Sequence, residues 1–319
     1  MNTPYFDQLI DDFGIWQHTK NQQILRQHGY ALDDAARGLI TCLVLDKMNQ
    51  ASVLFEYLEK SYDGTRLYGF AHADRTFFSS PASEDATAQA VWALGYAWHL
   101  GFQKARATTL LQALRPKILN AQYVRGPAYA LLGALYIDRE LADQLMAKLR
   151  SFFVGTTSGW PWPEPTMTYG NGILPYAFLR YGLVTGDKSA IRDGRKLLAF
   201  IQQKCETNRP LGPVGNEGWL PKGSNEPPDF AQQPIDAAYM IWACVAAYEL
   251  SGNQSDLVLA KRWWQWYEGH NIAKTRMYNP QTLEAYDGIE RAKINDDSGA
   301  ESNICLLLSM KMLETKKTV

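Results

Sequence analysis

The sequence predicts an all-α fold, an (α/α)6 barrel built from six helical hairpins, on three observations. Apolar residues recur at helical spacing in twelve segments, and amphipathic segments alternate with segments that are apolar nearly all round. The apolar segments begin with polar residues that recur at intervals of 41 to 65 residues, which is typical of a helical-hairpin repeat. The longest connections precede apolar segments, so these loops gather at the N-terminal ends of the inner helices.

The amphipathic segments are expected to form outer helices and the apolar segments inner helices. An amphipathic helix buries one stripe, whereas a helix without a polar side has to be surrounded by other elements. We expect inner helices that begin near residues 30, 81, 126, 169, 233 and 298. We expect outer helices over residues 5–28, 50–62, 103–118, 140–153, 187–205 and 256–267.

Hairpin repeats of this kind form either an open solenoid or a closed ring. A solenoid would leave a polar concave face and need polar end caps, whereas the expected inner helices are apolar on all sides. We therefore predict closure and a single domain over residues 1–319. Short strands are expected only in loops, at residues 66–70 and 276–285.

Composition argues against several classes of function. The 32 Lys and Arg residues balance 33 Asp and Glu residues without long runs of one sign, which disfavours a nucleic-acid partner. Neither a signal peptide nor a membrane-spanning apolar run is recognisable, so we expect no membrane partner and a cytoplasmic location. The four cysteines are far apart and are expected to be core residues in a reducing compartment. Metal-ligand spacings and phosphate-binding loops are not recognisable either, so neither a metal nor a cofactor is predicted.

Carboxylates are concentrated where the inner helices are expected to begin. A glycoside hydrolase needs two of them, because one carboxyl protonates the leaving group and one carboxylate activates water or attacks directly. The separation of the pair would decide between inversion and retention. The catalytic candidates are Asp34, Asp85, Asp236 and Glu301. The residues expected to bind substrate are Asp33, Arg37, Glu84, Trp160, Trp162, Glu164, Asn171, Asn216, Trp219, Gln233 and Asp287.

Helix capping is the structural alternative for each of these acids. Acids near a helix start often cap it, and the helix dipole favours them by ~0.3–1 kcal/mol. Capping does not explain why such acids are denser at the starts of the apolar helices than at those of the amphipathic ones. A capping carboxyl has a lowered pKa, whereas a general acid needs a raised one, so the two roles differ chemically.

Aromatic residues are frequent, with 10 Trp and 17 Tyr. Such rings either fill a core or stack against the faces of sugar rings. Residues 160–164 hold two prolines and two tryptophans and are expected to line a cleft. Residues 213–219 would bring an amide, an acid and an indole close to it. The tryptophans of residues 263–266 are expected to pack between helix layers instead.

Single features of the sequence suggest two other chemistries. His72 lies in the long loop before Asp85, where a histidine could serve as the acid-base of a sugar epimerase. Asp33 and Asp34 are similar to the metal-binding acids of terpene cyclases, but Arg37 stands where a third acid would be needed.

Six blocks of sequence carry a family resemblance. The six blocks cover residues 29–37, 83–89, 160–171, 213–219, 232–237 and 297–302. They include Gly-Tyr-Ala-Leu-Asp-Asp-Ala-Ala-Arg at 29–37, Ser-Glu-Asp at 83–85, Trp-Pro-Trp-Pro-Glu at 160–164, Pro-Val-Gly-Asn-Glu-Gly-Trp at 213–219, Gln-Gln-Pro-Ile-Asp-Ala at 232–237 and Asp-Ser-Gly-Ala-Glu-Ser at 297–302. The chain resembles a bacterial family of (α/α)6-barrel, glycoside-hydrolase-like proteins that occur near, or fused to, glycosyltransferases and mannoside phosphorylases. The resemblance implies this barrel, a carbohydrate substrate, and a glycosyltransferase or glycoside phosphorylase as a partner.

The chain departs from the family pattern at a few positions. Gly170 stands where an acid is expected before Asn171, Ala35 replaces an asparagine, and residues 88–89 replace a Gly-Arg pair. The blocks around the four catalytic candidates are intact.

The sequence therefore predicts a carbohydrate-active enzyme, and the leading hypothesis is a glycoside hydrolase acting on an oligosaccharide. The resemblance suggests a mannose-containing oligosaccharide or one linked to exopolysaccharide synthesis. One alternative is a sugar 2-epimerase-type isomerase on the same barrel, for which His72 is the histidine expected near the site. The other is a non-catalytic sugar-binding or scaffold partner of a glycosyltransferase, which the departure at Gly170 suggests.

Overall fold

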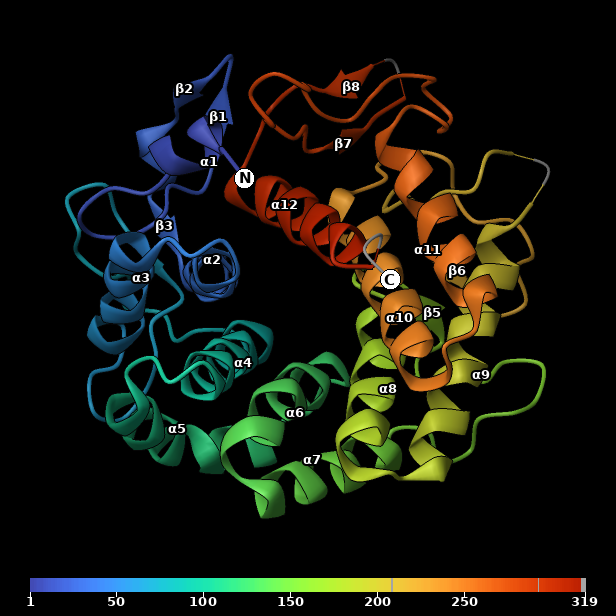
Figure 1. Cartoon of the computed structure of the whole chain (residues 1–319), viewed down its shortest axis with the longest axis horizontal. Helices are drawn as coiled ribbons and strands as arrows, with labels where there is room; N and C mark the ends of the chain where they lie inside the picture. Colours follow the sequence, from blue (N-terminus) through green and yellow to red (C-terminus); the bar gives the residue numbers. More distant parts are fainter. Residues whose placement is uncertain (208, 292, 317–319) are drawn as a thin grey trace. The chain divides into compact units, whose positions relative to one another are not determined.

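A computed structural model describes residues 1–207, 209–291 and 293–316 of the chain, which are mainly helical (Figure 1). The α-helices are α1 (Pro4–Gln8), α2 (Leu32–Val44), α3 (Met48–Lys60), α4 (Glu84–His99), α5 (Lys104–Leu119), α6 (Arg125–Ile137), α7 (Arg139–Ser151), α8 (Ile173–Thr185), α9 (Lys188–Cys205), α10 (Pro234–Ser251), α11 (Gln254–Tyr267) and α12 (Ala300–Glu314). A 3-10 helix covers Arg26–His28.

Short strands pair into two-stranded antiparallel sheets. The pairs are β1 (Thr19–Lys20) with β2 (Gln23–Ile24), β3 (Tyr30–Ala31) with β4 (Phe70–Ala71), β5 (Thr166–Met167) with β6 (Leu220–Pro221), and β7 (Gly288–Ile289) with β8 (Ile294–Asn295). All of them lie in the connections between helices.

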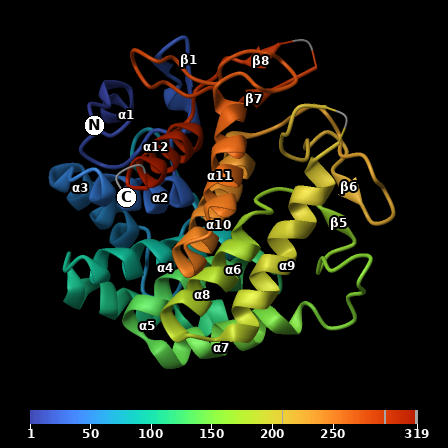
Figure 2. The same cartoon turned by 45° about the vertical axis from the view of Figure 1, so that its right-hand side comes forward.

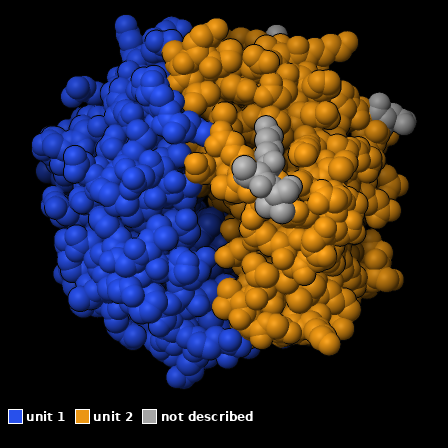
Figure 3. Space-filling view, viewed as in Figure 1, with its two compact units in different colours: residues 1–151, 298–304 blue, residues 152–297, 305–319 orange. Residues whose placement is uncertain are grey.

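The chain divides into two compact units (Figure 3). Unit 1 comprises Met1–Ser151 and Ser298–Ile304, and unit 2 comprises Phe152–Asp297 and Cys305–Val319. The start of α12 therefore belongs to unit 1 and the remainder of that helix to unit 2. The expected single domain stays a prediction.

Unit 1 is built from three helical hairpins, α2 with α3, α4 with α5, and α6 with α7 (Figure 1). Helices α2, α4 and α6 pack side by side as one layer, and the amphipathic helices cover them. Contact between α4 and α6 is close because Gly95 and Gly133 face each other without side chains. The core of unit 1 lies between the two layers, as the buried stripe of α7 shows with Leu141, Ala142, Leu145, Met146 and Leu149.

Unit 2 repeats this design with α8 and α9, and with α10 and α11 (Figure 2). Helix α10 begins with Pro234 at its first position and ends at Gly252, whose φ of 66° is the left-handed conformation that glycine adopts readily. Its residues 234–247 are all buried, as expected of an inner helix. Trp263 and Trp266 of α11 are fully buried, which confirms the expected packing between helix layers for these two, whereas Trp264 is half-buried.

Helices α2 to α12 confirm eleven of the twelve expected helices, and the expected outer helix over residues 5–28 is wrong. Only Pro4–Gln8 is helical there. The Asp11 side chain accepts hydrogen bonds from the backbone amides of Phe13 and Gly14, which turns the chain. Asn21 and Gln22, with φ of 49° and 63°, then form the tight turn between β1 and β2.

The connections follow the expected distribution. Those before α4, α8, α10 and α12 span residues 61–83, 152–172, 206–233 and 268–299, whereas those inside the helical hairpins are a few residues long. The first expected strand is displaced to β4, and in the second region an isolated bridge joins Tyr278 to Ala285. Across the described ranges, every helix is too short or too polar to cross a membrane.

Candidate active site

A buried arginine collects three carboxylates in unit 1. Arg37 Nη1 lies 2.7 Å from Glu301 Oε2, and Nη2 lies 3.1 Å from Asp34 Oδ1 and 3.4 Å from Asp33 Oδ2. The guanidinium group is charged at all physiological pH values, so burying it requires acceptors of this kind. We call these four residues the Arg37 cluster.

The members of the Arg37 cluster come from two helix starts. Asp33 and Asp34 lie in the first turn of α2, Arg37 one turn further along, and Glu301 in the first turn of α12. The side chain of Asp34 is 6% exposed, whereas those of Asp33 and Glu301 are 34% and 37% exposed. Asp34 is therefore the buried partner of the arginine, and Asp33 and Glu301 are the carboxylates open to a ligand.

Asp33, Asp34 and Asp236 are not the N-cap residues of their helices. The N-cap residues of α2 and α10 are Ala31 and Gln233, and neither makes a side-chain capping bond. Asp187 and Asn253 do cap outer helices, since Asp187 accepts from two amides of α9 and Asn253 accepts from one of α11. These three acids therefore lie in the first turn of their helices, where the helix dipole favours them, and are not the N-cap residues.

Two residues at the start of α4 have structural roles, one as the helix cap and one in hydrogen bonds to a neighbouring loop. Ser83 Oγ caps the helix by accepting from the Ala86 amide at 3.1 Å. Glu84 Oε2 accepts from the amides of Gln122 and Tyr123 at 2.8 and 3.0 Å, which fixes the connection before α6. Asp85 lies half-buried in the first turn of α4, and α4 packs against α2.

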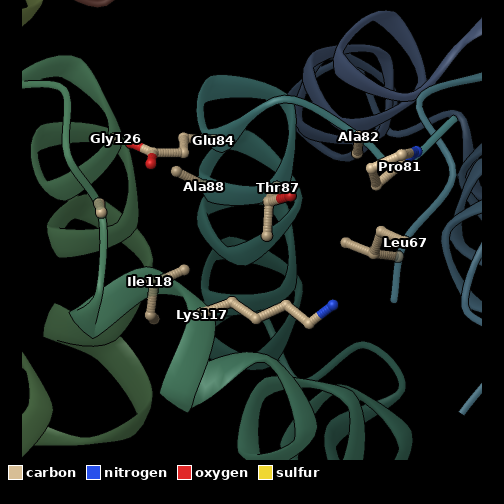
Figure 4. Close-up of a pocket in the computed structure, with 10 residues that line it drawn as sticks. Leu67, Pro81, Ala82, Glu84, Thr87, Ala88, Lys117, Ile118 and Gly126 are labelled. Carbon is tan, nitrogen blue, oxygen red and sulfur yellow. The ribbon is translucent and has the colours of Figure 1, made fainter. Parts of the chain in front are cut away.

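A pocket of about 170 Å³ opens beside the start of α4 in unit 1 (Figure 4). Glu84, Thr87 and Ala88 of α4 form one wall, and Lys117 and Ile118 at the end of α5 form another. Glu84 is the one carboxylate among its lining residues, and the Arg37 cluster contributes nothing to it. This pocket therefore lacks the paired acids that glycoside hydrolysis requires.

The segment that replaces the expected first helix lies beside the start of α12. The amide of Ser298 donates to the Thr19 carbonyl at 3.2 Å, and the amide of Ala300 donates to the Gln17 carbonyl at 3.0 Å. The rings of His18 and His28 lie 4.9 Å apart in this segment. The structure thus brings two histidines close to the helix start that carries Glu301. The sequence did not indicate this proximity, because both histidines fall within the expected helix over residues 5–28.

Asn171 joins two helix starts in unit 2. Its backbone amide donates to Asp236 Oδ1 at 3.2 Å, and its side-chain amide donates to the Thr168 carbonyl at 3.0 Å. Its buried Oδ1 has no hydrogen-bond partner. Gly170 has a φ of 58°, so the backbone here favours glycine over the acid that the family pattern has. A side chain on Gly172 would collide with the backbone of α10, which fixes Asn171 against Asp236.

The three indoles expected to stack on sugar differ in exposure. Trp160 and Trp162 are 4% and 1% exposed, and Trp160 Nε1 donates to the Glu164 carbonyl at 2.8 Å. Trp219 is 43% exposed, and its Nε1 donates to Asn216 Oδ1 at 3.2 Å. Trp219 is therefore the indole that offers a ring face, while the other two support the loop.

The remaining predicted residues of unit 2, Gln233 and Asp287, are half-buried. The adjacent Gln232 pairs through its backbone with Ile289, and its Oε1 accepts from Trp266 Nε1 at 2.7 Å. The backbone before Gln233, the N-cap residue of α10, is therefore held in place.

In the portion of the chain that the structure describes, no three His, Cys, Asp or Glu side chains are grouped so as to hold a metal ion.

Comparison with solved structures identifies the fold. Cellobiose 2-epimerase from Bacillus thermoamylovorans superposes with a TM-score of 0.73 at 14% sequence identity, over 97% of this chain and 95% of that chain. D-mannose isomerase gives 0.73 at 12% identity, over 98% and 94%. The GH76 α-mannanase of Bacteroides thetaiotaomicron gives 0.66 at 12% identity, over 98% and 94%.

The chain has the (α/α)6-barrel fold. This confirms the fold class predicted from the alternation of amphipathic and apolar segments. No protein-family model matches the sequence, and neither does any curated protein. At these identities the likeness establishes the barrel fold alone, so chemistry has to be argued from side chains.

Proposed function

We propose that the protein is a carbohydrate-active enzyme that processes an oligosaccharide or glycoside. The observation that carries this proposal is the Arg37 cluster, in which a buried guanidinium group holds two partly exposed carboxylates. Support comes from the (α/α)6-barrel fold, which the chain shares with a cellobiose 2-epimerase, a D-mannose isomerase and an α-mannanase.

The favoured reaction is glycoside hydrolysis with acids of unit 1. Glu301 is engaged by Arg37 at 2.7 Å, so it suits the role that needs a carboxylate, as base or nucleophile at the anomeric carbon. Asp85, at the start of the neighbouring helix α4, would donate the proton to the leaving oxygen as the C–O bond breaks. If Glu301 acts as the base, it takes a proton from the attacking water, and exchange with solvent then returns Glu301 to its ionised form and Asp85 to its protonated form. If Glu301 is the nucleophile, Asp85 takes the proton from the water that releases the glycosyl intermediate. Asp34 would hold Arg37 in place.

Some of the other predicted residues keep their proposed roles. Asp236 remains a catalytic candidate. Within unit 2, Asn216 and Gln233 would hydrogen-bond sugar hydroxyl groups, and Trp219 would stack on a ring. Within unit 1, a hydrogen bond from Arg37 to a sugar hydroxyl group stays a prediction from the sequence. A glycosyltransferase or glycoside phosphorylase partner also remains a prediction from the family resemblance.

A second candidate is sugar 2-epimerisation, which the pair His18 and His28 favours. This reaction removes a proton from the carbon next to a carbonyl group and returns one to the opposite face. The rings of His18 and His28 lie 4.9 Å apart in edge contact, in a segment bonded to the start of α12. They would have to separate to admit the sugar, and one could then act as the base and the other as the acid. His72 suits this role less well, because its ring stacks on Phe78 at 3.8 Å.

The test is a product analysis with purified protein in heavy water. Manno-, gluco- and galacto-oligosaccharides are incubated with the protein, and chromatography and NMR follow released sugars, 2-epimers and deuterium at C2. Hydrolysis predicts new reducing ends without deuterium at C2, whereas epimerisation predicts deuterium there and no shortened chains.

Glu301→Gln should abolish hydrolysis, and Glu314→Gln, at the other end of α12, is the matched control. His18→Ala, with His270→Ala as control, tests epimerisation. A sugar-induced thermal shift without any product would contradict an enzymatic role and leave a sugar-binding protein.

A further inference from the structure

Residues 70–78 form a β-hairpin in the long loop of unit 1. The amide of Phe78 donates to the Phe70 carbonyl at 3.0 Å, and a bridge joins Ala71 to Phe77. Side chains alternate between the two faces of a strand. Phe70, His72 and Phe78 therefore share one face of the hairpin, and Ala71 and Phe77 share the other.

One face of this hairpin is packed into the protein. Ala71 is fully buried. The ring of Phe77 lies 5.9 Å from that of Tyr68, 5.6 Å from that of Tyr57 and 6.0 Å from that of Phe13. These contacts fix the orientation of the hairpin on unit 1.

The other face carries aromatic rings where an antiparallel hairpin usually has polar side chains. Phe70 is 43% exposed and Phe78 is 37% exposed. The His72 ring stacks on Phe78 at 3.8 Å with an interplanar angle of 23°, and the Phe70 ring meets Phe78 edge-on at 6.1 Å. We call Phe70, His72 and Phe78 the aromatic platform. An exposed group of apolar rings on a folded surface indicates a binding function.

The aromatic platform is held rigidly. A Cβ atom on Gly29 would lie 2.0 Å from the Ala71 carbonyl oxygen, so the hairpin is in close contact with the segment before α2. At its turn, Arg75 forms an ion pair with Asp12. A ligand would therefore meet rings that are already in position, which lowers the entropy lost on binding.

Strand pairing connects the aromatic platform to the helix start that carries Asp33 and Asp34. Phe70 is the register partner of Ala31 in the β3–β4 pair, and the amide of Leu32 donates to the Gly69 carbonyl at 2.9 Å. Leu32 begins α2, and Asp33 follows it directly. The strand pair thus connects the platform to the first turn that supplies two of the carboxylates.

We propose that the aromatic platform is a subsite for a second sugar ring of an oligosaccharide whose reacting unit binds at the Arg37 cluster. A pyranose ring presents a face of C–H groups that matches an aromatic ring, and its hydroxyl groups point sideways into water. This inference rests on the proposed function and adds that the substrate has at least two sugar units. The reacting sugar unit would then lie near Asp33, and the next sugar unit of the substrate would lie near Phe70.

The experiment measures binding against chain length. Mannose, mannobiose, mannotriose and the corresponding gluco-oligosaccharides are titrated into the full chain by ligand-detected NMR and calorimetry. Wild-type protein should bind the disaccharide and trisaccharide more tightly than the monosaccharide. The double variant Phe70→Ala, Phe78→Ala should lose roughly 3- to 10-fold of that gain. Phe78→Tyr keeps a ring and should retain it. Leu100→Ala removes an equally exposed apolar side chain in the short α4–α5 connection and is the matched control.

Each outcome separates this inference from the proposed function. A double variant that keeps the full length dependence would overturn the subsite and leave the proposed function intact. If the double variant loses the length dependence, the subsite is supported. If Glu301→Gln leaves turnover unaltered in the same series, the proposed catalytic role of Glu301 is contradicted. If neither sugar series binds the wild type, the subsite is wrong. Size-exclusion chromatography of the wild type and the double variant would then reveal whether a second copy of the chain uses this face.

Discussion

Arg37 is the residue on which the local stability of the candidate site depends. Its guanidinium group is 1% exposed and makes ion pairs with three carboxylates, one of which, Asp34, is almost as deeply buried. The arrangement is stable only as a set, because a buried carboxylate without its cation carries a large desolvation cost.

Arg37→Met should therefore destabilise the protein strongly. Removing one partner of a buried ion pair costs roughly 3–5 kcal/mol of unfolding free energy. The matched control is Arg139→Met, which removes an exposed pair with Asp143 and should cost less than about 1 kcal/mol. Urea unfolding followed by circular dichroism measures both. Equal effects of the two substitutions would show that Arg37 is not the buried organising charge.

The cysteines provide a second prediction, on pH. Cys42, Cys205, Cys244 and Cys305 are all buried, and burial raises the pKa of Cys205 to about 12 from an ordinary value of 9.0. The folded state therefore holds this proton more strongly than the unfolded state. Its contribution to stability is complete below about pH 9 and is lost as the pH rises through 12.

Thiol labelling checks this prediction. At pH 8 the native protein should react slowly with a disulfide reagent such as DTNB, and urea should release all four thiols. The unfolding free energy should decline between pH 9 and pH 11. Rapid labelling of Cys205 in the native state would contradict the burial argument.

At the scale of elements, the close contact between α4 and α6 depends on two glycines. A Cβ atom at Gly95 would lie 2.1 Å from the Gly133 carbonyl oxygen, and backbone cannot move aside as a side chain can. Gly95→Ala should lower the unfolding free energy by ~1–3 kcal/mol, although alanine favours helix. Gly126→Ala, on α6 itself, would meet Ala121 at 3.4 Å, an ordinary contact, and should be nearly neutral or stabilising. Thermal unfolding compares the two, and equal stability would mean that the helices separate easily.

The same scale explains which elements the sequence could predict. Inner helices such as α10 are apolar on every side, and long loops precede most of them. Their alternation with amphipathic helices could therefore be recognised from the sequence alone. Residues 5–28 have apolar residues at helical spacing too, but that spacing reports burial and not the hydrogen-bond pattern. The Asp11 side chain and the left-handed residues Asn21 and Gln22 turn this segment into loops and strands.

The candidate site was predictable to a more limited extent. Asp33, Asp34 and Arg37 are close in sequence, and helical spacing places them together. The ion pair from Arg37 to Glu301 spans the chain and depends on tertiary structure. The solvent exposure of aromatic side chains also depends on tertiary structure. Trp160 and Trp162 were expected in a cleft and are buried, whereas Phe70 and Phe78 were not singled out and are exposed.

At the scale of the whole molecule, the proposed enzyme binds a sugar that reacts at the Arg37 cluster of unit 1. The (α/α)6-barrel fold is compatible with several sugar chemistries, so the reaction type depends on which side chains meet the substrate. Glu301 is the most informative of them, because it is partly exposed and also bonded to the buried arginine.

The most direct measurement is kcat/KM of Glu301→Gln on the best sugar substrate, beside wild type and Glu314→Gln. If Glu301 takes part in proton transfer or attack, its loss should lower kcat/KM by about 10²-fold or more at unchanged thermal stability. Glu314→Gln should match wild type. A Glu301→Gln enzyme within a few-fold of wild type would contradict the central claim that the Arg37 cluster is the catalytic centre.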